Sequence, residues 1–195
     1  MTHELNFNIT VNGAITEAVR GHGFNEFQAF AEYIHNLPYG RPDCAQDILA
    51  VLKEGRGTCS VKHRLLAAVA DECGHPEVEL VVGLYAMSEQ NTPGVGTTLK
   101  AAGFAWIPEA HCYLQVRDRR YDFTGLTSGT DSPFDALLSE HPAHWLDLPD
   151  QKSRLHQQAM ALWATGNALA FDDAWRLREA CIQSLADRSK SKTHA

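Results

Sequence analysis

The sequence of 195 residues predicts an α+β fold, and three observations predict it. Apolar side chains recur at helical spacing before residue 74, β-favouring segments follow between residues 78 and 124, and helical spacing returns after residue 129. Helices and strands therefore occupy separate stretches of the chain instead of alternating. This order favours a core of helices packed on an antiparallel sheet, with a helical C-terminal third.

A strand and two helices are expected first. Residues 5–11 alternate apolar and polar side chains, which is typical of a half-buried strand. Apolar side chains at helical spacing predict a helix over residues 24–37. Asp43 and Gln46 form a capping-box pattern before a second helix, which Gly55 ends.

The third helix has the clearest signals in the chain. Thr58 is a suitable N-cap, and an apolar stripe runs from Val61 to Cys73. Gly74 and then Pro76 indicate where the helix ends.

A strand and a long connection follow this helix. Residues 78–87 are almost continuously β-favouring, which predicts a buried strand. Residues 88–109 contain several prolines and glycines, so we expect an irregular, mobile connection that borders the site. Phe104 and Trp106, near its end, either cover a substrate or anchor the connection to the core.

A hairpin and a helical region complete the chain. Residues 111–116 and 119–124 read as two strands joined by the two-residue turn between them. Ser132 precedes a proline at the start of a short helix, and helical stripes return over residues 155–166 and 172–185.

Composition and charge exclude several classes of protein. The formal net charge is −7, whereas a nucleic-acid-binding protein normally carries a basic excess. No apolar stretch approaches the length of a membrane span, so no membrane association is expected. Five scattered cysteines and no recognisable secretory signal favour reduced thiols and a cytoplasmic location.

Cys59 has the position that a nucleophilic thiol needs. It follows Gly-Arg-Gly-Thr and begins the third predicted helix. The partial positive charge of a helix N-terminus favours the thiolate, and the N–H groups of the first turn can face a developing oxyanion. We therefore expect Cys59 to be the most reactive of the five thiols.

The predicted hairpin supplies a candidate base and a residue that orients it. With a two-residue turn, Tyr113 pairs with Asp122, and His111 shares the sheet face of Tyr113. Asp122 then becomes a diagonal neighbour of His111, within reach of a carboxylate–imidazole hydrogen bond. A slip of one residue would place the two on opposite faces.

Together these residues resemble the transglutaminase-like superfamily of cysteine enzymes, which have papain-like catalytic geometry. The matching features are Gly-x-Gly-Thr-Cys59 at a helix start, a following strand, a strand that begins with His111, and Asp122-Phe-Thr. The resemblance implies that Cys59 is the nucleophile, His111 the base and Asp122 the residue that orients the base. It covers roughly residues 39–125, and the four residues after Cys59 (Ser-Val-Lys-His) depart from the family pattern.

The length of the chain predicts one domain with a helical appendage, and the resemblance implies a second oxyanion donor. We expect a single domain over residues 1–195, with a transglutaminase-like catalytic core at 1–130 and a helical extension at 131–187. The donor usually lies upstream of the cysteine, where Tyr39 is the candidate and Gln46 and Asn36 are weaker ones. The other interpretation of Tyr39, an aromatic residue of a turn that packs on the core, is slightly favoured.

The function expected from this resemblance is acyl transfer from an amide through a thioester on Cys59. Hydrolysis of a peptide or a small amide is favoured over cross-linking, with no cofactor and no metal.

One alternative is a non-catalytic module of the same fold that binds a peptide or partner. Another is a zinc-binding protein that uses Cys59 and His63, four residues apart on one helix face, although His63 reads better as a surface or supporting residue. Further candidate ligands in that reading are His111, Cys112, His141 and His144.

Overall fold

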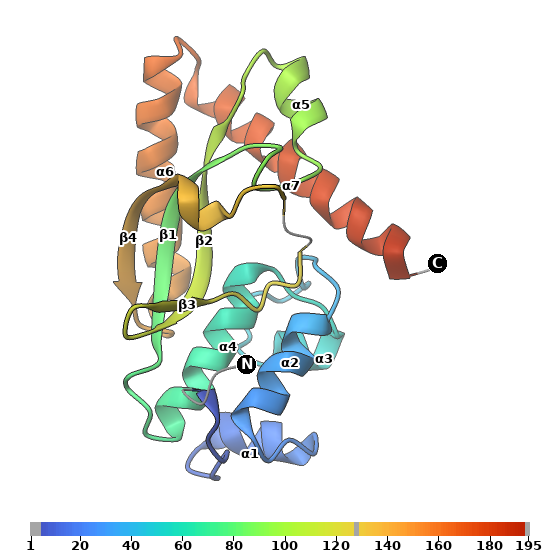
Figure 1. Ribbon diagram of the computed structural model, residues 1–195, viewed down its shortest axis with the longest axis vertical. Coiled ribbons are helices and arrows are strands. Elements are labelled where there is room, and N and C mark those ends of the chain that lie inside the picture. Colours follow the sequence, from blue (N-terminus) through green and yellow to red (C-terminus); the bar gives the residue numbers. More distant parts are fainter. Residues whose placement is uncertain (1–4, 127–128, 194–195) are drawn as a thin grey trace. The chain divides into compact units, whose positions relative to one another are not determined.

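The structure is a computed structural model that describes residues 5–126 and 129–193, with side chains described as far as residue 187. It confirms the α+β class. Four strands form one antiparallel sheet in the order β3-β2-β1-β4 (Figure 1). The elements in chain order are α1 (Ala14–Gly21), α2 (Phe27–Asn36), α3 (Ala50–Glu54), α4 (Cys59–Glu72), β1 (Glu79–Met87), α5 (Gly96–Ala101), β2 (Ile107–Val116), β3 (Arg119–Tyr121), the 3-10 helix η2 (Pro133–Ala136), β4 (Leu137–Ala143), α6 (Leu148–Gly166) and α7 (Phe171–Thr193).

The chain divides into two compact units, and neither is one continuous segment. The described residues of the first unit fall within Met1–Val81, Cys112–Gly125 and Pro142–Leu148. Those of the second unit fall within Val82–His111, Leu126–His141 and Pro149–Ala195. The organisation into a catalytic core and an extension that meet near residue 130 stays a prediction.

Helix α4 is the central helix of the first unit, with α1, α2 and α3 packed against it (Figure 1). Its fully buried side chains include Leu65 and Leu66. The carboxylate of Glu72, at the end of α4, accepts hydrogen bonds from the backbone N–H groups of Ile15 (3.3 Å) and Thr16 (2.7 Å). A carboxylate at the start of α1 satisfies N–H groups that have no acceptor within the helix. This contact fixes α1 to α4.

The second unit contains α5, most of α6, and α7, and α5 packs on α7. Glu109 of β2 forms a two-pronged ion pair with Arg178 of α7, with N–O distances of 2.6 and 2.7 Å. Both side chains are almost fully buried. Although burial alone would raise it, the pKa of Glu109 is held at about 2 by the charge and hydrogen bonds of Arg178.

The predicted strand over residues 5–11 is wrong. Only an isolated antiparallel bridge between Asn8 and Glu26 forms in this segment. The backbone N–H of Ile9 donates to Asn25 O, and that of Phe27 donates to Phe7 O, both at 2.9 Å. Helix α2 begins at Phe27, so the partner segment leaves the extended conformation and the ladder ends. Helix α1 was not predicted at all.

The expected cap of the second helix is also wrong. Helix α3 begins at Ala50, where the carboxylate of Asp47 accepts a hydrogen bond from the N–H of Leu49 (3.0 Å). Asp43 instead donates its backbone N–H to the carboxylate of Glu54 (2.9 Å) at the other end of α3. The predicted end is confirmed, since Gly55 has a φ of 64° and takes the left-handed C-cap conformation.

Two further expectations are corrected beyond α4. The connection at residues 88–109 is not irregular throughout, because it contains α5 and its last residues belong to β2. The region at residues 131–187 is not wholly helical, because β4 lies within it. Pro142 fits this strand because β4 is at the edge of the sheet, where proline is tolerated. No helix in the described part of the chain has the length and apolarity needed to cross a membrane.

Candidate functional site

Cys59 is the first residue of α4, as predicted. Thr58 occupies the N-cap position in an extended conformation, but its side chain makes no capping hydrogen bond. The side chain of Cys59 is buried, with the residue 6% exposed. Its Sγ lies 3.9 Å from Ser60 Oγ. The backbone N–H groups in the first turn of a helix have no carbonyl acceptor within the helix, and they carry its partial positive charge. This surrounding stabilises a thiolate better than a thiol.

Tyr39 lies beside the segment that leads into Cys59. Gly57 donates its N–H to Pro38 O (3.1 Å), and Gly40 donates its N–H to Gly57 O (3.4 Å). These two hydrogen bonds hold the backbone on both sides of Tyr39 against Gly57. Tyr39 itself is buried, so the structure is compatible with both the core-packing role and the oxyanion role expected for it.

Asp122 is held in place by its own turn. Its Oδ1 accepts hydrogen bonds from the backbone N–H of Thr124 (2.8 Å) and from the Thr124 hydroxyl. This local hydrogen bonding replaces the sheet ladder, which explains why β3 ends at Tyr121 and not at Thr124 as predicted. The predicted register is confirmed, since Val116 pairs with Arg119 and Leu114 pairs with Tyr121. Extended by one residue, this register sets Asp122 opposite Tyr113.

His63 connects the start of α4 to the backbone beside Asp122. Its Nε2 accepts a hydrogen bond from the N–H of Phe123 (2.8 Å), so this nitrogen carries no proton. Its Nδ1 therefore carries the ring proton and donates it to Cys59 O (2.8 Å). The ring is neutral, so the 3.7 Å separation between Nε2 and Asp122 Oδ1 is a contact and not an ion pair. With its lone pair engaged in this way, His63 is unsuited to be the general base.

Lys62 is fully buried at the same place. Its Nζ donates hydrogen bonds to three backbone carbonyls, those of Leu37 (2.6 Å), Thr124 (2.8 Å) and His35 (3.3 Å). Burial lowers the pKa of Lys62 to about 8, while the negative charges of Asp122 and Cys59 oppose this change. The structure therefore brings Cys59 and Asp122 together in the first unit, within electrostatic reach of one ammonium.

His111 belongs to β2 and to the second unit. It is buried, and its ring centroid lies 6.2 Å from that of Tyr85 and 6.3 Å from that of Phe134. Along β2, it precedes Tyr113 by two residues, and residues at this spacing share a face of a strand.

The zinc-binding alternative loses His63 as a ligand in this arrangement. Both ring nitrogens of His63 are engaged in hydrogen bonds, one of them with the carbonyl of Cys59 itself. His141 Nε2 lies 3.0 Å from Ser139 Oγ, and His144 Nδ1 accepts a hydrogen bond from Leu146 N (3.2 Å). Within residues 5–126 and 129–193, no group of three or more potential ligands is arranged to hold a metal ion.

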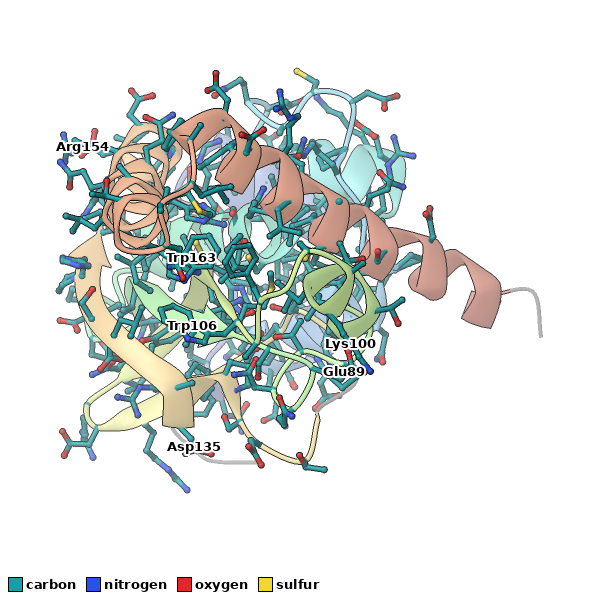
Figure 2. The ribbon with its side chains drawn as sticks, turned by 90° about the horizontal axis from the view of Figure 1, so that it is seen from above. Glu89, Lys100, Trp106, Asp135, Arg154 and Trp163 are labelled. Atoms are coloured by element: carbon teal, nitrogen blue, oxygen red, sulfur yellow. The ribbon has the colours of Figure 1, made fainter. Side chains whose placement is uncertain are left out.

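Phe104 and Trp106, at the end of the connection, pack on α6. The ring centroids of Phe104 and Trp106 lie 4.8 and 6.1 Å from that of Trp163. Figure 2 shows Trp106 and Trp163 close together. These contacts favour the role of an anchor over that of a cover for a substrate.

Sequence reasoning gave Lys62 no role and His63 only a surface or supporting one. The signal for His63 was present, because a residue four positions after Cys59 lies on the same helix face. Lys62 has the same helical spacing, three positions after Cys59, but lysine is among the residues least often buried, so the sequence favours a solvated side chain there.

The chain was also compared with known proteins. Searches against protein-family models, curated proteins and solved structures found no match to this chain.

Proposed function

We propose that the chain is a transglutaminase-like cysteine enzyme that transfers an acyl group from an amide through a thioester on Cys59. His111 acts as the general base, and Asp122 orients it. The observation that carries the proposal is the setting of Cys59. A buried thiol is the first residue of the central helix of its unit, within electrostatic reach of the Lys62 ammonium.

The chemistry requires one proton acceptor and one oxyanion site. The imidazole of His111 takes the thiol proton, and Cys59 Sγ attacks the carbonyl carbon of the amide. The oxyanion that forms is stabilised by N–H groups at the start of α4. The proton on His111 then passes to the leaving amine as the C–N bond breaks. Water attacks the thioester in the second half-reaction, which releases a carboxylic acid and restores the thiol.

The exclusion of His63 as a base supports this assignment of roles. His63 is the histidine nearest to Cys59 in the sequence, but its Nε2 lone pair is engaged by the N–H of Phe123. The base must therefore come from elsewhere, and the sequence motif assigns it to His111. Asp122 has a fixed Oδ1, as a residue that orients an imidazole requires.

The substrate class we propose is a peptide or a small amide, with hydrolysis favoured over transamidation. A panel of small amides and glutamine-containing peptides tests this, with and without an added primary amine. We expect release of acid or ammonia by the wild type and none by Cys59→Ala. Exposed Cys44→Ala is the matched control and should keep the wild-type rate.

The outcomes separate the alternatives. Activity that Cys59→Ala retains would overturn the assignment of the nucleophile. Peptides that bind the wild type and Cys59→Ala equally well, without turnover, would instead indicate a non-catalytic binding module. Stoichiometric zinc whose removal unfolds the protein would indicate a structural metal protein.

A further inference from the structure

We propose that Lys62 is a positioning residue of this site: it holds the segment Asp122–Gly125 against the start of α4 and stabilises negative charge on Cys59. This inference deepens the proposed function. Only the part of the inference that concerns turnover of a substrate rests on that function. The reactivity of Cys59 tests it independently of any substrate.

The first argument is the set of contacts made by Lys62 Nζ. Two of its acceptors, His35 O and Leu37 O, lie at the end of α2, and the third, Thr124 O, lies two residues after Asp122. An ammonium has three N–H donors, and here each has a carbonyl. One side chain thus joins the C-terminal end of α2 and the segment after β3 to α4.

Two glycines let the backbone approach Lys62 closely. A Cβ on Gly57 would lie 2.9 Å from Lys62 Cγ. Gly125 has a φ of 77°, and a Cβ there would lie 2.1 Å from His35 O and 3.5 Å from Lys62 Nζ. Only residues without a Cβ fit at these two positions, so the backbone around Lys62 forms a closely fitted enclosure.

The second argument concerns charge. Placing an ammonium in a buried site costs free energy, and three neutral carbonyls compensate only part of that cost. Thr124, whose carbonyl accepts from Lys62 Nζ, also donates its N–H to Asp122 Oδ1, and Cys59 lies three residues before Lys62 on α4. The ionisable groups that attract the ammonium are therefore Asp122 and Cys59. The attraction is mutual, so the ammonium favours the charged forms of both groups. His63, the other titratable side chain at this position, is neutral and adds no charge.

His63 reinforces the same arrangement from the neighbouring position of α4. It ties Phe123 N to Cys59 O through its two ring nitrogens. Lys62 and His63 therefore fix two consecutive residues after Asp122 to the first turn of the helix. The neutral ring of His63 makes this connection by hydrogen bonds alone. The ammonium of Lys62 also carries a charge, and under this inference that charge lowers the pH at which the Cys59 thiol loses its proton.

The first experiment measures the thiolate titration of Cys59 in Lys62→Met and Lys62→Arg. Thiolate absorbance in the ultraviolet, corrected with Cys59→Ser, gives the midpoint, and iodoacetamide gives the rate. We expect the midpoint in Lys62→Met to move up by about one pH unit and alkylation at neutral pH to slow about tenfold. Lys62→Arg should recover part of the effect because it keeps the charge. Lys53→Met, at an exposed lysine of α3, is the control and should behave as wild type.

A folded Lys62→Met with an unchanged midpoint would overturn the inference. If Lys62→Met does not fold, the reciprocal measurement decides the matter, because coupling between two sites acts equally in both directions. Nuclear magnetic resonance of the Lys62 side chain follows its own titration in the wild type, Cys59→Ser and Asp122→Asn. We expect a lower midpoint in both variants, and an unchanged one in both would overturn the inference.

The failure of this inference is distinguishable from the failure of the proposed function. If Lys62→Met shifts the Cys59 titration but no amide is turned over, Lys62 tunes the thiol and the enzyme assignment fails. If Cys59-dependent turnover occurs with the same pH profile in a folded Lys62→Met, the function stands and the role of Lys62 fails.

Discussion

At the scale of single residues, Gly57 lets the backbone before Cys59 pass close to the side chain of Lys62. It lies two residues before Cys59, and its backbone hydrogen-bonds on both sides of Tyr39. A Cβ at this position would approach Lys62 Cγ to 2.9 Å, and one methyl group each of Val51 and Val61 to 3.2 Å. The contact is tight on three sides, so an added methyl group must displace the side chain of Lys62 or the backbone.

We predict that Gly57→Ala lowers the free energy of unfolding by about 1–3 kcal/mol, because it overpacks a buried site. It should also slow alkylation of Cys59, since Lys62 must move. Gly40→Ala is the matched control: its Cβ would lie at an ordinary 3.6 Å from Arg56 Cδ, and the change should stay within about 0.5 kcal/mol. Denaturant titration measures the free energy of unfolding of the two variants. Equal losses in Gly57→Ala and Gly40→Ala would contradict the tight packing described around Gly57.

At this scale, the sequence predicted what local chemistry determines. The position of Cys59 at a helix start follows from Thr58 and the two glycines before it. The hairpin register also follows from a two-residue turn, and it sets Asp122 opposite Tyr113. The roles of Lys62 and His63 depend on carbonyls and an N–H about 25 to 60 residues away in the chain, and no local pattern encodes those contacts.

At the scale of elements, a buried ion pair connects β2 to α7. Glu109 and Arg178 are both almost fully buried, and the ring of Trp175 lies 5.7 Å from the guanidinium. Removal of one member of such a pair leaves an uncompensated buried charge. The pair therefore fixes α7 to the strand that also carries His111.

We predict that Arg178→Met lowers the free energy of unfolding by about 3–5 kcal/mol. The control is the exposed pair between Arg176 and Asp173 on the same helix, where Arg176→Met should cost under about 1 kcal/mol. Chemical denaturation of the two variants makes the comparison. Similar losses in both would show that the buried pair contributes no more than a surface one.

The errors at this scale have tertiary causes. Residues 5–11 have the alternation of a strand, but their partner segment becomes α2 after a single bridge. Residues 137–143 became a strand although the surrounding sequence is helical, because the edge of the sheet beside β1 gives them a partner. Periodicity identifies which side chains face a core, but the presence of a neighbouring strand is decided elsewhere in the chain.

At the scale of the whole molecule, two buried groups contribute to the dependence of stability on pH. The pKa of Glu109 is lowered to about 2, so its contribution is complete above its ordinary value of 4.5 and is lost as the pH falls from there towards 2. The pKa of Lys62 is lowered to about 8 from 10.5. Between pH 8 and pH 10.5 the unfolded chain binds more protons at Lys62 than the folded chain does, so the free energy of unfolding rises with pH in that window.

We predict that one substitution makes each of these two slopes shallower. In Glu109→Gln the loss of stability below pH 4.5 should be shallower than in the wild type. In Lys62→Met the rise between pH 8 and pH 10.5 should be shallower. Denaturant titrations across the pH range measure both slopes. A wild-type slope that either variant fully retains would show that the group in question does not titrate as its surroundings dictate.

The most direct test of the central claim is the relative reactivity of the five thiols. Iodoacetamide at pH 6, followed by peptide mass spectrometry, gives a separate rate for each cysteine. A thiolate at the start of α4 predicts that Cys59 reacts faster than the exposed Cys44 and faster than cysteine as a free amino acid, although Cys59 is buried. A Cys59 rate no greater than that of the free amino acid would contradict its assignment as the nucleophile.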